Sequence, residues 1–131
     1  MASIFTKIIA GDIPSYKIIE DENYYAFLDI KPLKRGHTLV IPKKEVDNIF
    51  DLEPKELAGL HTFSQKVAKA IEKVIKCKKI AVVVLGLEVA HAHIHLIPID
   101  SEKDVHFSNS RVNLSEDEFN EIAKAIRDNI E

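Results

Sequence analysis

Three of the six histidines of the chain stand at alternate positions, His91, His93 and His95, and the residues between them are apolar. Because successive side chains of a β-strand point to opposite faces, a strand here places three imidazoles in a row on one open face and the apolar residues in a core. A neutral imidazole can act as a nucleophile, exchange protons or bind a metal ion. The spacing therefore predicts a site on one half-buried strand.

This row of histidines admits three interpretations. The first is an exposed polar strand without a function. The second is a metal site, but all three histidines cannot share one zinc ion. His91 and His95 are about 13 Å apart along a strand, whereas two imidazoles on one zinc ion span only about 10 Å between their β-carbons. No Cys-x-x-Cys motif supplies further ligands. The third is nucleophilic catalysis, in which the middle histidine attacks phosphorus and its neighbours orient it or bind phosphoryl oxygens.

Hydrophobic periodicity predicts the elements that position this site. A short helix is followed by a hairpin, a β-branched strand, a long amphipathic helix, two further strands and a helix that opens with a capping box. The predicted ranges are Ile4–Ile9, Tyr16–Glu20 with Tyr24–Leu28, Thr38–Ile41, Pro54–Val74, Ile80–Leu85, His91–Ile99 and 115–130. The continuous apolar run Ile80–Leu85 predicts a buried central strand. Adjacent strands joined by short turns predict an α+β fold, with an antiparallel sheet, a long central helix and a C-terminal helix.

Length and composition limit the class of protein. At 131 residues the chain is expected to form a single domain over residues 1–131. Hydrophobic residues make up 46% and charged residues 30%, which argues against disorder. The net charge of −3 attracts neither nucleic acid nor an acidic membrane. No apolar stretch reaches the about 18 residues of a membrane span, the first residues do not form a signal peptide, and the single Cys77 fits a reducing compartment. We therefore expect a cytoplasmic protein.

The sequence His-Ala-His-Ile-His-Leu-Ile-Pro resembles the signature of the histidine-triad (HIT) family of nucleotide hydrolases and transferases. Three earlier blocks are also similar to the family, at residues 4–14, Phe27–Pro32 and Gly36–Lys44. Together the blocks extend in the family's order over residues 3–98, and the predicted C-terminal helix lies beyond them.

The resemblance implies a small α+β unit, commonly paired as a homodimer, that takes a purine nucleotide as substrate and needs no cofactor. By position, His93 resembles the catalytic nucleophile and His91 and His95 its supports. Asp29 resembles the acid that binds the ribose hydroxyls, and His37 resembles a histidine that supports the triad from behind. The resemblance further implies an apolar slot for the base at Ile4, Phe5, Ile8, Phe27 and Leu28.

The sequence departs from the family at two places. Many members bind a structural zinc ion with a Cys-x-x-Cys pair and a histidine, where this chain has Ser3, Thr6 and Glu45. Because hydroxyls are poor zinc ligands, no metal is expected. The run Val83–Val89 is shorter than the family's loop and lacks its Asn, Gln and Ser. If Glu88 of this run faces the site, its charge disfavours an anionic polyphosphate leaving group.

These observations predict a hydrolase that cleaves nucleoside phosphoramidates, or related nucleotidyl compounds, through a covalent nucleotidyl-histidine intermediate on His93. A dinucleoside polyphosphate hydrolase is the alternative enzyme. A nucleotide-binding regulator without catalytic activity is the alternative from another class, and turnover distinguishes it from both enzymes.

Overall fold

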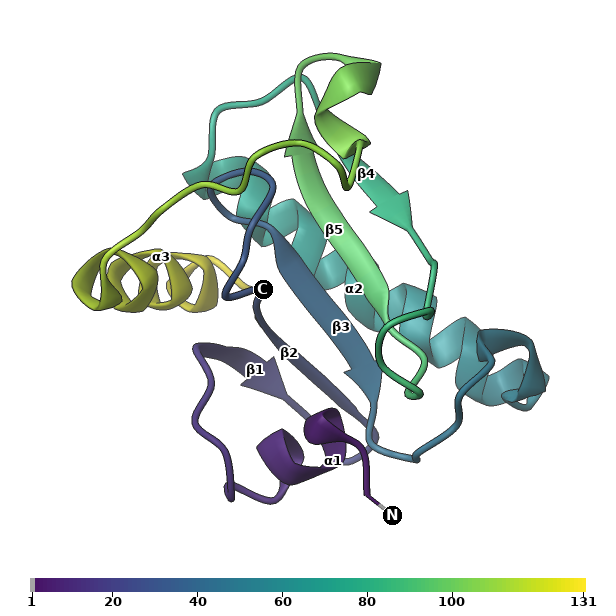
Figure 1. The fold of residues 1–131 in the computed structure, drawn as a ribbon. Helices are drawn as coiled ribbons and strands as arrows, with labels where there is room; N and C mark the ends of the chain where they lie inside the picture. Colours follow the sequence, from purple (N-terminus) through teal and green to yellow (C-terminus); the bar gives the residue numbers. More distant parts are fainter. Residues whose placement is uncertain (1) are drawn as a thin grey trace.

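The computed structural model describes residues 2–131, which form a five-stranded antiparallel sheet and its helices (Figure 1). The helices are α1 (Ile4–Ile9), α2 (Pro54–Val74) and α3 (Glu116–Asp128), with the short 3₁₀ helices η1 (Ile49–Asp51) and η2 (Glu102–Val105). The strands are β1 (Lys17–Glu20), β2 (Tyr24–Leu28), β3 (Thr38–Pro42), β4 (Lys79–Val83) and β5 (Ile94–Ile99). The predicted α+β fold is confirmed. Within residues 2–131, no helix has both the length and the low polarity that crossing a membrane requires.

The order of the strands places the histidine motif inside the sheet. The strands lie side by side as β1-β2-β3-β5-β4, and each neighbouring pair is antiparallel. β5 therefore lies between β3 and β4. His95 is in register with Leu39 of β3 and with Val83 of β4. Strand pairing on both sides thus fixes the backbone that carries this histidine.

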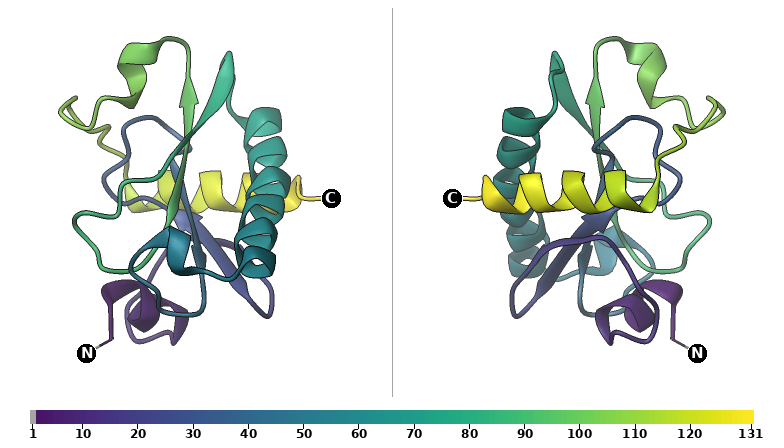
Figure 2. Two further views of the ribbon diagram at one scale, coloured as in Figure 1. Left: turned by 90° about the vertical axis from the view of Figure 1, so that its right-hand side faces the viewer. Right: turned by 90° about the vertical axis from the view of Figure 1, so that its left-hand side faces the viewer.

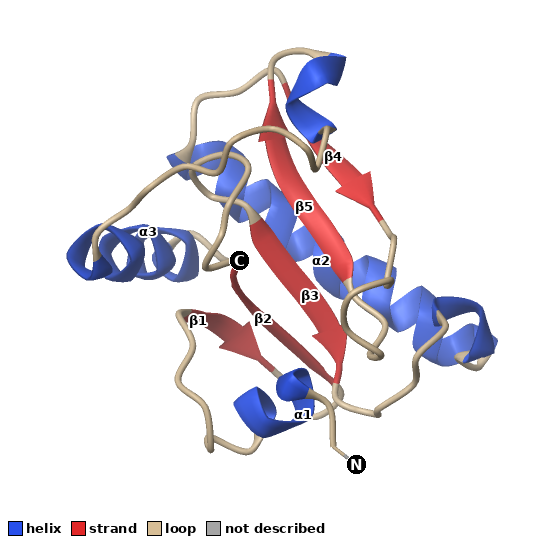
Figure 3. Ribbon diagram, in the orientation of Figure 1, coloured by secondary structure: helices blue, strands red, loops and turns tan. Residues whose placement is uncertain are grey.

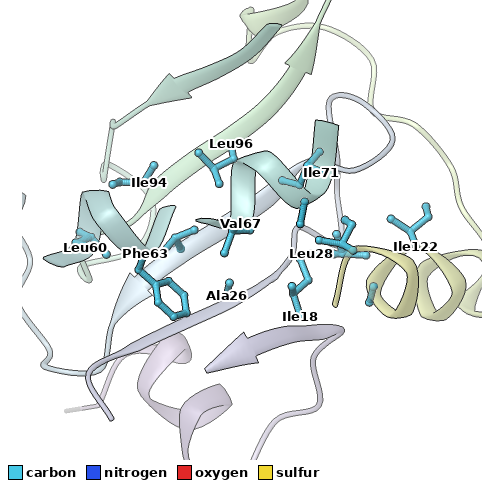
Figure 4. Packing of buried hydrophobic residues seen from close by; sticks show 14 of the residues in the cluster. Ile18, Ala26, Leu28, Leu60, Phe63, Val67, Ile71, Ile94, Leu96 and Ile122 are labelled. Atoms are coloured by element: carbon cyan, nitrogen blue, oxygen red, sulfur yellow. The ribbon is translucent and has the colours of Figure 1, made fainter. Parts of the chain in front are cut away.

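The two faces of the sheet are covered by different helices, as the edge-on views of Figure 2 show. α2 packs on one face, and residues of α3 join it in the larger core cluster. Figure 4 shows Val67 and Ile71 of α2 near Leu28 and Leu96 of the sheet, with Ile122 of α3 beside them. This cluster anchors the sheet, and it leaves the opposite face for the site.

A second, smaller cluster lies on that opposite face and includes α1. Along β2 and β3, the residues that alternate with those of the larger core belong to this cluster, as strand geometry requires. Its buried members are Phe5, Ile8, Tyr25, Phe27, Leu39 and Ile41. α1 is thereby packed beside the triad.

The long helices begin where the sequence signals predict. Pro54 is the first residue of α2, where its missing N–H costs no hydrogen bond. α3 follows Ser115, whose side chain accepts a hydrogen bond from the Glu118 N–H, while the Glu118 carboxylate accepts one from the Ser115 N–H, both at 3.1 Å. This capping box satisfies N–H groups that the helix itself leaves without partners.

β4 is an edge strand, which corrects the prediction of a buried central strand at Ile80–Leu85. The strand ends at Val83, and the Val82 side chain is 57% exposed. A continuous apolar run fits a strand that is buried on both faces, but it also fits an edge strand with apolar side chains left in solvent. Sequence periodicity alone does not separate these two cases.

Candidate active site

The three histidines of the motif point to the face of the sheet that α1 covers. β5 begins only at Ile94, so His91 and His93 lie in the connection before it, and the predicted strand His91–Ile99 was too long at its start. The Ala92 N–H donates to a carbonyl of the loop after β3, at 2.6 Å, rather than to a neighbouring strand. The alternation still holds, because Ala92 and Ile94 belong to the core on the α2 side.

The imidazoles are buried, which corrects the prediction of an open face. His91, His93 and His95 are 0%, 6% and 7% exposed. Phe5 of α1 lies edge-on to His91 and His93, with ring centroids 5.7 Å and 5.0 Å apart. Phe107, after η2, lies edge-on to His95 at 4.9 Å. The alternation along one strand says nothing about which distant segments cover it, so the sequence could not reveal this aromatic cover.

The hydrogen-bond partner of His93 assigns its tautomer. Nδ1 of His93 lies 2.7 Å from the backbone oxygen of His91. Because a carbonyl oxygen only accepts, Nδ1 must carry the hydrogen. The neutral ring then has its lone pair on Nε2. A histidine in this form can attack an electrophile without first losing a proton.

Both ring nitrogens of His91 have partners. Nε2 lies 2.8 Å from the Pro42 carbonyl and therefore donates to it. Nδ1 is left as an acceptor, and the Ser3 hydroxyl donates to it across 2.8 Å. A ring with both nitrogens engaged fits a supporting role, in which the backbone oxygen of His91 orients His93.

A relay through His37 assigns the tautomer of His95. The Leu33 N–H donates to Nδ1 of His37 at 3.0 Å, so His37 carries its hydrogen on Nε2. That group donates to Nδ1 of His95, also at 3.0 Å. His95 therefore carries its own hydrogen on Nε2. This N–H is the type of donor that stabilises negative charge on a phosphoryl oxygen.

Burial keeps the supporting imidazoles uncharged. Burial is the main cause, and together with smaller effects of a neighbouring histidine and of the Arg111 charge it lowers the pKa of His37 to about 3 and that of His95 to about 4. Burial also lowers the pKa of His91, against the opposing effects of its hydrogen bond to a carbonyl and of the Glu45 charge. At pH 7 these three rings are neutral, which is the state that the assigned hydrogen bonds require.

Asp29 lies at the end of β2, beside this relay. Its Oδ1 accepts a hydrogen bond from the Lys31 N–H at 2.9 Å, and its Oδ2 lies 3.6 Å from Nε2 of His37. Burial is the main cause that raises the pKa of Asp29, and the Glu88 charge raises it further, whereas the Lys31 N–H and the Arg111 charge lower it. The charge of the loop residue Glu88 is the smallest of these influences on Asp29.

Asp29, His37 and His95 bring three atoms that could bind a metal ion within 4.8 Å of one another. Two of these atoms, Nε2 of His37 and Nδ1 of His95, already share a hydrogen bond. This bond accounts for their closeness, so the cluster does not require a metal ion.

The predicted apolar slot is only partly assembled. Phe5, Ile8 and Phe27 lie together in the smaller cluster, and the rings of Phe5 and Phe27 are 5.6 Å apart. Ile4 is 49% exposed and belongs to neither core cluster. Leu28 packs in the core on the α2 side (Figure 4), which corrects its assignment to the slot. Strand alternation is the reason, since Phe27 and Leu28 point to opposite faces.

Two residues at the site escaped the sequence analysis, Phe107 and Arg111. They lie on the loop that runs from η2 to α3, drawn in tan in Figure 3. Arg111 donates to the carbonyls of Lys31 and Phe107 at 2.8 Å and 3.1 Å, and its guanidinium lies 5.5 Å from the Phe107 ring centroid. An aromatic residue and an arginine four positions apart in a polar stretch were the only signal in the sequence.

Known proteins are similar to this chain in both sequence and fold. Residues 10–102 match the model of the HIT domain. An uncharacterized HIT-like protein from Borreliella burgdorferi is 34% identical over an alignment of 135 positions, gaps included, that covers 97% of each chain. Adenosine 5'-monophosphoramidase HNT1 from Saccharomyces cerevisiae is 40% identical over 107 residues, which cover 78% of this chain and 65% of the yeast protein. The crystal structure of a hypothetical histidine triad nucleotide-binding protein from Sulfolobus tokodaii has a TM-score of 0.85 at 28% identity, and the match covers 96% of this chain and 90% of that one. The chain therefore belongs to the HIT family.

Proposed function

We propose that this protein is a nucleotide-binding hydrolase that cleaves nucleoside phosphoramidates through a covalent intermediate on His93. The observation that carries the proposal is the hydrogen bond from Nδ1 of His93 to the backbone oxygen of His91, which leaves the lone pair on Nε2. The phosphoramidase from yeast, a relative at 40% identity, supports the substrate class.

In the first step, Nε2 of His93 attacks the phosphorus atom and the P–N bond of the substrate breaks. The amine leaves after taking up a proton from solvent. The nucleoside monophosphate is then bonded to Nε2, and the ring is cationic because Nδ1 keeps its hydrogen. The carbonyl of His91 stabilises that cation, and the Nε2–H of His95 donates to the phosphoryl oxygens on which negative charge develops.

In the second step, water attacks the phosphorus atom from the side opposite His93. The bond between phosphorus and Nε2 breaks, and its electron pair returns to the imidazole. A proton of the attacking water passes to solvent, and the nucleoside monophosphate leaves. The two steps consume only the substrate and water, and they return His93 to its starting tautomer.

We place the nucleoside on the α1 side of His93. The Asp29 side chain is 17% exposed and offers carboxylate oxygens that can accept the ribose hydroxyls. The neighbouring rings of Phe5 and Phe27 provide flat apolar surfaces for a purine base.

Glu88 favours phosphoramidates over dinucleoside polyphosphates, the alternative substrates. Its charge acts on Asp29, so it also acts on groups bound beside Asp29. A polyphosphate leaving group is anionic and is repelled by a carboxylate, whereas an amine is not.

We also propose a homodimer that forms through β4. This edge strand has a row of backbone groups on its outer side that can pair with another strand. Apolar side chains are exposed on and after it, namely Val82, Val84, Leu85 and Leu87. A two-fold axis beside β4 brings the same strand of a second copy into antiparallel pairing and covers these side chains.

Turnover and protein mass test the proposed function together. We expect the wild-type protein to hydrolyse adenosine and guanosine phosphoramidates. When the reaction is stopped with acid-free denaturant, the protein should carry the added mass of one nucleotidyl group, which is a nucleoside monophosphate less one water. His93→Asn should bind AMP but lose turnover by several orders of magnitude, because it lacks the nucleophile. The control His61→Asn, on the exposed surface of α2, should behave as wild type. Binding without turnover in the wild-type protein would instead indicate a nucleotide-binding regulator.

A further inference from the structure

A network of hydrogen bonds joins Ser3, Thr6, Glu45 and His91. Oε1 of Glu45 accepts from the Ser3 backbone N–H and, at 2.6 Å, from the Thr6 hydroxyl. The Thr6 N–H donates to Oγ of Ser3 at 3.0 Å, which caps α1. The Ser3 hydroxyl donates to Nδ1 of His91 at 2.8 Å. The network thus connects three parts of the chain: the start of α1, the loop after β3 and the histidine motif.

Each hydrogen in this network has one assigned acceptor. The Ser3 hydroxyl lies 3.3 Å from Oγ1 of Thr6 and 2.8 Å from Nδ1 of His91. Because Nε2 of His91 donates to the Pro42 carbonyl, Nδ1 can only accept, and the single hydroxyl hydrogen of Ser3 makes this shorter bond. The Thr6 hydroxyl lies 2.6 Å from Glu45 but 3.5 Å from Nδ1, so its hydrogen belongs to Glu45. The bonds from Ser3 and Thr6 lower the pKa of Glu45 to about 2, which keeps the carboxylate ionised near neutral pH.

The residues of this network do not fit the zinc ion that many HIT proteins hold at these positions. The set offers two hydroxyls, one carboxylate and one imidazole, and neutral hydroxyls are poor zinc ligands. Oε1 of Glu45 and Nδ1 of His91 are both engaged in hydrogen bonds with the hydroxyls of the set. Here hydrogen bonds connect the positions that a metal connects elsewhere.

We propose that Glu45 is a positioning residue, which acts through the hydroxyls of Thr6 and Ser3 to hold His91 and to dock α1 on the triad. The inference rests on the proposed function for its effect on turnover. A fixed His91 keeps its backbone oxygen aligned with His93, 2.7 Å from Nδ1. A docked α1 keeps the Phe5 ring 5.0 Å from the His93 ring. The network therefore fixes both the direction of the nucleophile and one wall of the base slot.

Steady-state kinetics provide the first test. We expect Glu45→Gln and Thr6→Val each to lower kcat by about 10- to 100-fold, because small displacements of a nucleophile are costly. KM should rise by a smaller factor than kcat falls, since Asp29 is untouched and only the Phe5 wall of the base slot loses its support. The control Glu121→Gln removes the same charge from the exposed side of α3 and should leave kcat unchanged. An unchanged kcat in both network variants would overturn the proposal.

Nitrogen NMR of the His91 ring provides a test that does not depend on turnover. In the wild-type protein we expect one tautomer, with the hydrogen on Nε2 and a hydrogen-bonded Nδ1. Ser3→Ala and Glu45→Gln should both shift the Nδ1 resonance towards that of a free nitrogen. If these shifts occur in a protein that hydrolyses nothing, the proposed function fails and the positioning network stands. If Nδ1 is unmoved in both variants, the network does not hold His91.

A zinc site built at the same positions tests whether a metal ion can replace the hydrogen-bond network. The triple variant Ser3→Cys, Thr6→Cys, Glu45→His should bind one zinc ion per chain together with His91, and zinc should keep kcat within a few-fold of the wild-type value. A chelator should then lower kcat of this variant but not of the wild-type protein. A folded triple variant that binds no zinc, or stoichiometric zinc in the wild-type protein purified without added metal, would contradict the inference.

Discussion

Acid should destabilise this protein through its buried histidines. His37 is 0% exposed and His95 is 7% exposed, and burial lowers their pKa values from 6.5 to about 3 and about 4. A lowered pKa in the folded state means that only the unfolded chain takes up protons as the pH falls below 6.5. The stabilisation that these neutral rings provide is therefore complete above pH 6.5 and is lost as the pH falls towards 4 and 3.

The size of the effect follows from the two shifts. At pH 5 an unfolded histidine is almost fully protonated, whereas His37 and His95 in the folded protein are not, so each lowers the free energy of unfolding by about 2 kcal/mol relative to pH 8. Together they lower it by about 4 kcal/mol, a large part of the about 5–15 kcal/mol typical of a folded protein. The lowered pKa of His91 acts in the same direction. Asp29 acts in the opposite direction, because its pKa is raised.

Urea unfolding at pH 8, 7, 6 and 5, at constant ionic strength and protein concentration, measures this effect. His37→Asn should remove one of the two contributions, so that the loss between pH 8 and pH 5 falls from about 4 to about 2 kcal/mol. His61→Asn, on the exposed surface of α2, should keep the full pH dependence. A wild-type free energy of unfolding that changes by less than about 1 kcal/mol over this range would refute the reasoning.

Three further expectations concern the ligand and the assembly. Asp29→Ala should weaken the binding of AMP by about 1–3 kcal/mol more than that of its 2′,3′-dideoxy analogue, since the ribose hydroxyls lose their acceptor. Equal losses would remove Asp29 from the site. Glu88→Gln should reduce the preference for phosphoramidates over dinucleoside polyphosphates, measured as a ratio of kcat/KM values, and an unchanged ratio would make Glu88 irrelevant to specificity. Light scattering should give the mass of two chains for the wild-type protein and of one chain for Val82→Arg; a wild-type monomer at micromolar concentration would contradict pairing through β4.

The elements that depend on local pattern were predicted well. The range of β2 and the capping box of α3 were read correctly because strand-forming residues and capping side chains act over a few neighbouring positions. The position of β4 at the edge of the sheet was not predicted, because the order of strands depends on pairing between distant segments. A continuous apolar run does not indicate whether strands pair on one side of it or on both.

The candidate site shows the same limit. Alternation in the motif predicted correctly that the histidines share a face, opposite Ala92 and Ile94. Their tautomers were beyond reach, because these depend on distant backbone groups such as the Pro42 carbonyl and the Leu33 N–H. The sequence indicates the candidate side chains, whereas the fold determines which nitrogen of each carries the hydrogen.

The histidine motif and part of its aromatic cover lie in separate regions of the chain. Phe107 and Arg111 lie beyond residues 10–102, which match the family model. Their loop contacts the rest of the molecule here through bonds from Arg111 to Lys31 and from Val112 to Pro32, and not through strand pairing. Substitutions in this loop can therefore change the charge and shape around His95 while β5 stays in place. An exchange of this loop could therefore direct the proposed phosphorus chemistry to new leaving groups, and natural substitutions in the loop could do the same.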